Sequence, residues 1–423
     1  MSQSNNTLKI LNLKDENIKF HEDFVEEVNI KRKRSLVFHG ILSFIPTNCY
    51  KCGVIFDNNI IKHGFKTSNI KLPKISNLDT YLSLKKQRYL CRHCNSTFIL
   101  NTNIVDNHCY VSNNTKHSIA INATKKLSEC DIASNHNVSH STVNRIINSY
   151  YDSVKLYRNH LPENLCFDEF KSVKNADGNM SFIFCNADTG EIIDIVEDRR
   201  LNSLLKYFKY FSRESRSKVK NIVVDMHMPY ITVIKQLFPN ANIVTDRFHT
   251  IQLISRSLNK TRIKVMNQDK VNYRKFKRYW KLLLKARDKL DYGEYRKYTC
   301  FHNLMREVDI VDYLLDQNKE LKATYYFYQD IYYSIRTRNI NEFKRQINKE
   351  YNNLSNYMET SLKTLIQHQG YIINSLKEKY SNGVLEGINN MIKTIKRIAF
   401  GYRSFYHFKA RIMIIFGLIS LKT

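Results

Sequence analysis

Residues 219–246 read VKNIVVDMHMPYITVIKQLFPNANIVTD and contain two short apolar runs separated by an amphipathic segment. The runs Val219–Asp225 and Ala241–Asp246 have the length and β-branched composition of buried strands, and each ends in an aspartate. The segment between them, Tyr230–Phe238, follows Pro229 and has helical spacing. Strand, helix and strand in this order predict two parallel strands with a crossover helix, which is an α/β arrangement.

The residues before this unit predict three further strands and one helix. Leu165–Phe170, Met180–Cys185 and Glu191–Val196 are short apolar runs, and the turn 188–190 joins the last two. Leu201–Phe211 has helical periodicity. A meander of three antiparallel strands followed by parallel strands with helical crossovers is the order of a ribonuclease-H-like fold.

Acidic residues fall at one edge of this predicted sheet. Asp168 lies within the first strand and Asp225 ends the fourth, so both carboxylates should face the same edge. Carboxylate oxygens suit Mg²⁺ or Mn²⁺, and phosphoryl transfer on DNA commonly uses two such ions. Glu386 is a third candidate ligand because it is the last acid of the chain and heads a basic helix, although an acid there can equally complement the helix dipole.

Other acids near this edge have different interpretations. Glu169 should point to the opposite face of its strand and stay out of the metal site. Asp246 and His249 can lie near the active edge, although Asp246 can equally cap the next helix. Three acids are interpreted as ordinary turn or surface residues: Asp188, Asp194 and Asp198.

Two C-x-x-C pairs precede the α/β region, and they consist of Cys49, Cys52, Cys91 and Cys94. Structural Zn²⁺ prefers four such ligands in a tetrahedron, and two cysteine turns joined through a β-hairpin supply them. Gly53 permits the positive φ that the first turn needs. The pairs therefore predict a structural zinc site. The remaining cysteines considered are expected to be buried small residues: Cys130, Cys166, Cys185 and Cys300.

Residues 125–150, KKLSECDIASNHNVSHSTVNRIINSY, have the pattern of a helix-turn-helix. Ile132 and Ala133 begin one apolar helix face, and 135–137 form a polar turn. Ser139 caps a second helix whose inner face is apolar. Its outer face offers side chains that reach base edges in a major groove: His140, Ser141, Thr142, Asn144 and Arg145. A helical hairpin without a DNA role would share the apolar spacing.

The whole chain is strongly basic, because 67 Lys and Arg against 39 Asp and Glu give a net charge of +28 over 423 residues. This charge favours a polyanionic partner, above all nucleic acid. An AT-rich codon bias would raise the lysine content but would not explain the scarcity of acids. The most apolar stretch, Ile412–Leu421, is too short to span a membrane, and residues 1–16 lack a signal sequence, so we expect a cytoplasmic protein.

Residues 251–369 predict a helical insertion, because Gly and Pro are few and apolar residues recur at a spacing of three or four. The part from Arg256 to Lys297 contains 15 Lys or Arg and 4 Asp or Glu. Such a surface can hold DNA phosphates without reading bases. For any single side chain, a solvated face around an aromatic core is the alternative.

Four motifs in order, LCFDEFKS, VVDMHMPY, FPNANIVTDRFH and SNGVLEGINNMIKTIKRIAFGYRSF, resemble the catalytic domain of bacterial insertion-sequence transposases of the ISL-three group. Those proteins also begin with a zinc module followed by a helix-turn-helix, so the resemblance runs from about Asn48 to the C-terminus. The resemblance marks DRFH as a family motif. It implies a metal-binding DDE triad made of Asp168, Asp225 and Glu386.

The resemblance implies a transposase that binds terminal inverted repeats and target DNA. It also implies two Mg²⁺ or Mn²⁺ ions for strand cleavage and strand transfer, and a bacterial protein associated with the nucleoid. Joining two ends in one event implies a homodimer or a larger assembly. The alternatives are a non-catalytic DNA-binding regulator and a structure-selective nuclease of the same fold. Neither a serine nucleophile elbow nor a Cys/His pair beyond the zinc ligands is found in the sequence.

The expected domains are an N-terminal segment (1–36), a zinc ribbon (37–108), a helix-turn-helix domain (109–160), a catalytic domain (161–250 and 371–423) and a helical insertion (251–370).

Overall fold

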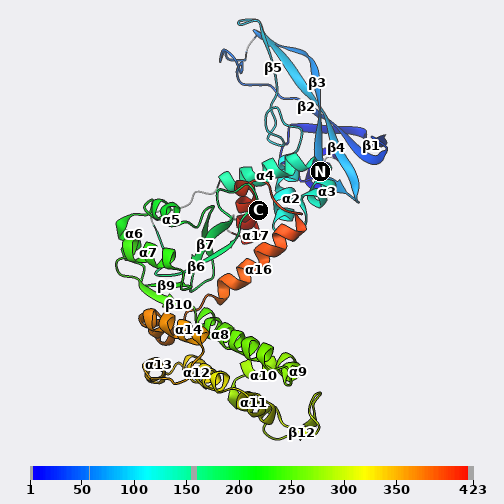
Figure 1. Ribbon diagram of the computed structural model, residues 1–423. Helices are drawn as coiled ribbons and strands as arrows, with labels where there is room; N and C mark the ends of the chain where they lie inside the picture. Colours follow the sequence, from blue (N-terminus) through cyan, green and yellow to red (C-terminus); the bar gives the residue numbers. More distant parts are fainter. Residues whose placement is uncertain (1–2, 57, 154–159, 418–423) are drawn as a thin grey trace. The chain divides into compact units, whose positions relative to one another are not determined.

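The computed structural model describes residues 3–56, 58–153 and 160–417, and the chain divides into two compact units (Figure 1). Unit 1 comprises residues 1–155 and 392–423, and unit 2 comprises residues 156–391. Helix α16 (Gly383–Ile398) begins in unit 2 and ends in unit 1. Within the described ranges, no helix is both long and apolar enough to cross a membrane.

Unit 1 opens with helix α1 (Gln3–Ile10) and a five-stranded sheet. The strands are β1 (Ile18–Ile30), β2 (Lys33–Leu42), β3 (Ile60–Ile75), β4 (Leu78–Cys91) and β5 (Ser96–Ile99). Their order is β1-β2-β4-β3, with β2 and β4 parallel, the other neighbours antiparallel and β5 paired with β4. Along β4, Leu82 and Leu84 alternate with less buried neighbours, which is the pattern of a strand with one covered face.

Residues 1–36 carry no predicted element, but the structure has α1, β1 and the first residues of β2 there. Most side chains described in β1 are exposed. A strand of this kind lacks the apolar alternation on which strand prediction depends.

Four helices form the second part of unit 1: α2 (Asn113–Ala123), α3 (Glu129–Asn135), α4 (His140–Asp152) and α17 (Phe405–Ile415). Their shared apolar core includes Ile119, Ile132 and Val143 from the first three helices and Ala410 and Ile414 from α17. Residues 371–423 are predicted to belong to the catalytic domain. The structure instead groups residues 392–423 with unit 1, because α17 packs on α4 and α2.

Unit 2 contains a mixed five-stranded sheet, as the sequence predicts. The strands are β6 (Asn164–Lys171), β7 (Met180–Asn186), β8 (Ile192–Val196), β9 (Asn221–Val224) and β10 (Asn242–Thr245). In the order β10-β9-β6-β7-β8, β6 to β8 form an antiparallel meander, while β9 runs parallel to both β6 and β10.

Three helices accompany the sheet: α5 (Leu201–Phe208), α6 (Arg213–Ser217) and α7 (Met228–Leu237). The positions of α5 and α7 confirm the two predicted helices, whereas α6 is a short addition. An aromatic cluster fills the space between helices and sheet, with Phe167 stacked on Phe208 at a centroid distance of 5.4 Å. This packing fixes β6, the strand that carries Asp168.

The region in which the sequence predicts a helical insertion is mostly helical. Its helices are α8 (Arg247–Gln268), α9 (Tyr273–Arg278), α10 (Trp280–Leu284), α11 (Glu307–Asp316), α12 (Lys319–Arg336), α13 (Ile340–Ile347), α14 (Asn356–Gln367) and α15 (Gln369–Lys377). A 3-10 turn, Arg287–Lys289, and a small hairpin of β11 (Arg296–Lys297) and β12 (Leu304–Met305) interrupt them. The insertion has its own apolar core, which includes Ile254, Phe276, Phe327 and Met358.

Two groups of residues differ in burial from the expectation. Cys166 and Cys185 are buried as expected, but the predicted burial of Cys130 and Cys300 is wrong, because both thiols belong to exposed residues. The expectation of turn or surface acids is also wrong for two residues on and after β8. Asp194 and Asp198 are buried, and hydroxyl groups donate hydrogen bonds to both, from Tyr207 and Ser203 respectively.

Candidate functional site: a cysteine cluster, a helix pair and an aspartate edge

The four predicted zinc ligands meet in unit 1. The Sγ atoms of Cys49 and Cys94 lie 3.8 Å apart, as do those of Cys52 and Cys91, and all four sulfurs lie within 4.8 Å of one another. Tetrahedral zinc with Zn–S bonds of about 2.3 Å places its sulfur ligands about 3.8 Å apart. The cluster therefore fits structural zinc.

Local backbone structure explains how the cysteines converge. Cys91 ends β4 and Cys94 lies in the turn to β5, while a bridge between Asn48 and Ile55 closes the other turn. Gly53 has a φ of 75°, as the sequence predicts. Hydrogen bonding from Ser96 lowers the pKa of the Cys94 thiol to about 6, which favours the thiolate that binds metal.

Helices α3 and α4 form the predicted helix pair. Ser139 caps α4 by accepting a hydrogen bond from the backbone N–H of Thr142, and Asn137 in the preceding turn has a φ of 50°. The inner face of α4 buries Val143, Ile146 and Ile147. The predicted outer residues are exposed or half-buried: His140, Ser141, Thr142, Asn144 and Arg145.

The parallel pairing of β6 with β9 brings two predicted aspartates to one edge of the unit 2 sheet. Cys166 pairs with Val223, so Asp168 and Asp225, each two residues further on, reach the same level. The next strand, β10, continues the parallel register and is followed directly by Asp246. Three neighbouring strands thus present aspartates at the same edge.

Both members of the central pair are partly withdrawn from water. Burial raises the pKa of Asp168 to about 6, and the negative charge of Asp225 adds to the rise. Burial also raises the pKa of Asp225, while the backbone N–H of His227 donates to its carboxylate and opposes the change. Paired, half-buried carboxylates of this kind gain from a divalent cation, because the cation offsets both their repulsion and their lost hydration.

Asn389 of α16 contacts the aspartate edge directly. Its Nδ2 donates to Asp168 Oδ2 at 2.9 Å and lies 3.3 Å from the carbonyl oxygen of Glu169. Its Oδ1 is buried without a hydrogen-bond partner among the described residues. Sequence reasoning missed Asn389. The available signal was its i, i+3 spacing from Glu386, which places both on one side of the helix.

Glu386 itself is exposed, one helical turn before Asn389. Its carboxylate is not gathered tightly with the aspartates. In the described part of the chain, the cysteine cluster is the sole group of three or more His, Cys, Asp or Glu with ligand atoms within 4.8 Å of one another. The first turn of α16 nevertheless lies close to the turn between β7 and β8, since a Cβ added to Gly190 would lie 2.8 Å from the Val384 side chain.

The remaining polar residues of this edge have structural partners. Asp246 caps α8 by accepting from the backbone N–H of Phe248 at 3.4 Å, so the capping interpretation holds. His249 lies 3.9 Å from Asp246, and its charge opposes the effect of burial on the pKa values of Asp168 and Asp225. Glu169 forms an ion pair with Arg199 and accepts a hydrogen bond from the hydroxyl of Tyr230.

Comparisons with known proteins agree with these features. The ISL3 group of DDE transposases, described as "Transposase", matches residues 165–412. The zinc-finger of transposases IS204, IS1001, IS1096 and IS1165 matches residues 45–94, which include the cysteine cluster.

Two relatives each align with 52% of this chain. A Lactococcus lactis protein named "ATP-dependent protease" is 29% identical over 72% of its own length. The transposase for insertion sequence element IS1001 of Bordetella parapertussis is 27% identical over 53% of its length. The solved Drosophila P element transposase strand transfer complex is 11% identical, with a TM-score of 0.32 over 73% of this chain and 92% of that one.

The family match covers more than half of the chain and includes the aspartate edge, and the separate zinc-finger match covers the cysteine cluster. This chain therefore belongs to the ISL3 group of transposases and carries the zinc ribbon of that group.

Proposed function

We propose that this protein cuts and joins DNA at the ends of an insertion sequence, with the aspartate edge of unit 2 as its active site. The single observation that carries the proposal is the parallel register of β6 and β9, because Asp168 and Asp225 each lie two residues beyond the paired residues Cys166 and Val223. The sheet order, a meander followed by parallel strands, supports a ribonuclease-H-like catalytic core. Family membership supports a DNA-processing enzyme.

Asp168, Asp225 and Glu386 would hold the divalent metals, as the family motif suggests. Mg²⁺ or Mn²⁺ bound by these residues would activate the attacking oxygen and stabilise the leaving oxygen. The protein contributes two carboxylates whose burial makes them receptive to cations. Asn389 orients Asp168, and it lies one turn beyond Glu386 on the same helix.

Unit 1 would recognise the terminal inverted repeats. The pair α3 and α4 supports a helix-turn-helix, with His140, Ser141, Thr142, Asn144 and Arg145 directed at the DNA. The zinc ribbon would stabilise this module, and the basic helices of residues 256–297 would hold flanking or target DNA by its phosphates. Joining two ends requires at least a homodimer. The proposal places the protein in the bacterial cytoplasm, associated with nucleoid DNA.

The test is incubation of purified protein and Mg²⁺ with a DNA fragment that carries the element's own terminus, followed by mapping of the cut strand. We expect cleavage at the terminus by wild type and none by Asp168→Asn, with end binding retained in the variant. Equal cleavage by both proteins would refute the active site. Binding without cleavage by wild type would favour a regulator, and cleavage of branched DNA with scrambled ends would favour a structure-selective nuclease.

A further inference from the structure

The C-terminal end of α16 has an unusual residue in a left-handed position. The N–H of Gly401 bonds to the carbonyl of Lys396 and the N–H of Phe400 to that of Arg397, which is the Schellman pattern of helix termination. The left-handed residue of this pattern is usually glycine, but here it is Phe400, with a φ of 53°. Its side chain is 98% exposed, so packing within the described structure does not compensate for the strained backbone.

The segment that follows, α17, packs against helices α2, α3 and α4. Ala410 and Ile414 of α17 are buried in the core shared with α2, α3 and α4. Tyr402 packs on the rings of Phe408 and His407, with centroid distances of 4.9 and 5.7 Å. The turn therefore leaves α16 and enters α17 at a defined place beside α4.

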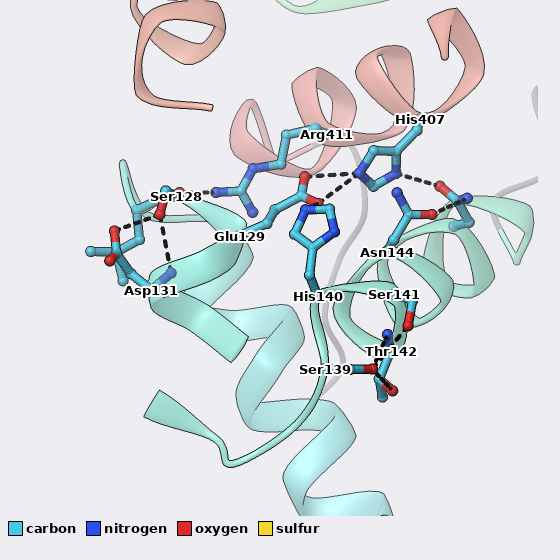
Figure 2. A network of polar contacts seen from close by, with 12 residues as sticks. Ser128, Glu129, Asp131, Ser139, His140, Ser141, Thr142, Asn144, His407 and Arg411 are labelled. Atoms are coloured by element: carbon cyan, nitrogen blue, oxygen red, sulfur yellow. Dashed lines mark hydrogen bonds and ion pairs between the residues drawn. The ribbon is translucent and has the colours of Figure 1, made fainter. Parts of the chain in front are cut away.

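Buried polar contacts fix this attachment (Figure 2). The carboxylate of Glu129 in α3 lies 2.8 Å from Nε2 of His407 in α17 and 3.3 Å from Nε2 of His140, the first residue of α4. Arg411 donates to the carbonyl oxygens of Lys125 and Leu127, just before α3. Glu129, His407 and Arg411 are all almost completely buried, so these contacts hold α17 in one register.

The turn and the outer face of α4 line the same cavity. Its volume is about 470 Å³, and its walls include His140 and Asn144 from α4 and residues 399–404 from the turn. Arg403 is an exposed cation at this wall. The one acid among the lining residues is Glu129, and the imidazoles of His407 and His140 already engage its carboxylate.

We propose that residues 399–404, here called the α16–α17 turn, form a second DNA-contacting element beside α4. The occupant is the duplex whose terminal repeat α4 reads, so the inference rests on the proposed function. Phe400 packs its ring against sugars and base edges of that duplex, and Arg403 pairs with a phosphate. Continuity with the outer face of α4, the net positive charge and a solvent-exposed ring on a strained turn all favour this occupant.

The key variant is Phe400→Gly, because it separates folding from binding. Glycine suits the left-handed position, so we expect the thermal midpoint to stay equal to that of wild type or to rise. Binding to a labelled fragment with the element's terminus should fall about ten-fold, the loss expected for one well-packed aromatic contact. Unchanged binding by Phe400→Gly would overturn the proposal, whatever its thermal midpoint.

A second variant, Arg403→Gln, tests the phosphate contact. We expect weaker binding to specific and scrambled ends alike. The slope of log K against the logarithm of the salt concentration should be shallower by about one unit, because one phosphate contact is lost. Matched controls in unit 2 are Tyr210→Ala and Arg213→Gln, both at exposed positions and both expected to bind like wild type. An Arg403→Gln variant with unchanged affinity and salt slope would contradict the phosphate contact.

Photocrosslinking locates the contact independently of affinity. A photoreactive benzoylphenylalanine in place of Phe400 should crosslink to DNA within the terminal repeat, whereas the same group at Tyr210 should not. Crosslinks from position 400 to protein alone would refute the inference. The proposed function and the inference fail differently: wild type that does not bind the terminus refutes the former, whereas normal binding by Phe400→Gly refutes only the latter.

Discussion

Asn389 donates a hydrogen bond to the carboxylate of Asp168 across a distance of 2.9 Å, and this bond joins α16 to the strand β6 at the proposed metal site. The two residues are 221 positions apart in the sequence. Glu386 lies one turn earlier on the same helix. The bond therefore also fixes the position of the Glu386 backbone relative to Asp168.

Replacing Asn389 should therefore weaken the metal site without dismantling the fold. We expect Asn389→Ala to lower end cleavage about 10–100-fold, as is typical when a group that orients a metal ligand is removed. The Mg²⁺ concentration for half-maximal cleavage should rise, and Mn²⁺ binding followed by electron paramagnetic resonance should weaken in parallel. Asn356→Ala, an exposed change in α14, is the control. Unaltered Mn²⁺ binding in Asn389→Ala would refute the orienting role.

Asp168→Asn should stabilise the protein at alkaline pH when no divalent cation is added. Burial raises the pKa of Asp168 from 3.8 to about 6, so the folded state holds the proton more tightly than the unfolded state. Ionisation of Asp168 therefore lowers the free energy of unfolding as the pH rises from about 4 to about 6, and the loss is complete above that range. The amide carries no such cost. We expect the thermal midpoint of Asp168→Asn to lie about 2–5 °C above that of wild type at pH 8 and to equal it near pH 4. A higher midpoint of the variant at low pH only would show that burial does not raise the pKa of Asp168.

Loss of zinc should affect unit 1 and spare unit 2. Cys94→Ser removes one of four ligands, and we expect zinc content, measured by atomic absorption, to fall from one ion per chain to well below one. Binding to the terminal repeat should drop at least about ten-fold, because the ribbon unfolds without its metal. Cys300→Ser, at an exposed position in the insertion, is the matched control and should keep its zinc. Full zinc occupancy in Cys94→Ser would disprove the four-cysteine site.

The buried contact between Glu129 and His407 should contribute strongly to the stability of unit 1. Removing one partner of a buried, hydrogen-bonded pair typically costs about 3–5 kcal/mol, so Glu129→Ala should lower the free energy of unfolding by that order. Glu163→Ala breaks an exposed ion pair with Lys220 and should cost less than about 1 kcal/mol. Urea unfolding of both variants measures the difference; similar small losses would show that the contact is not stabilising.

The secondary structure of residues 165–246 could be predicted closely because its strands carry a strong local signal. The run containing Asp168 and the run ending in Asp225 are short, apolar and β-branched, and the structure has β6 and β9 there. The strand β1 could not be predicted, since a polar and largely exposed strand depends on pairing with β2 for its existence.

Tertiary contacts explain the other differences. Asp194 looks like a surface acid in sequence, yet it is buried because Tyr207 from α5 donates a hydrogen bond to it. The position of α17 depends on contacts with helices far earlier in the chain, which no local pattern encodes. The spacing of Asn389 from Glu386 places both on one side of α16, but its hydrogen bond to Asp168 is a tertiary contact that this spacing does not encode.

The contact of α17 with α3 also determines when the helical core of unit 1 can be completed during synthesis. His407 is translated 278 residues after Glu129, which corresponds to on the order of 15–60 s at ordinary elongation rates. Throughout that interval the apolar face formed by Ile119 and Val143 lacks its cover. A nascent chain on the ribosome therefore lacks part of the core shared by α2, α3 and α4 until α17 has been synthesised.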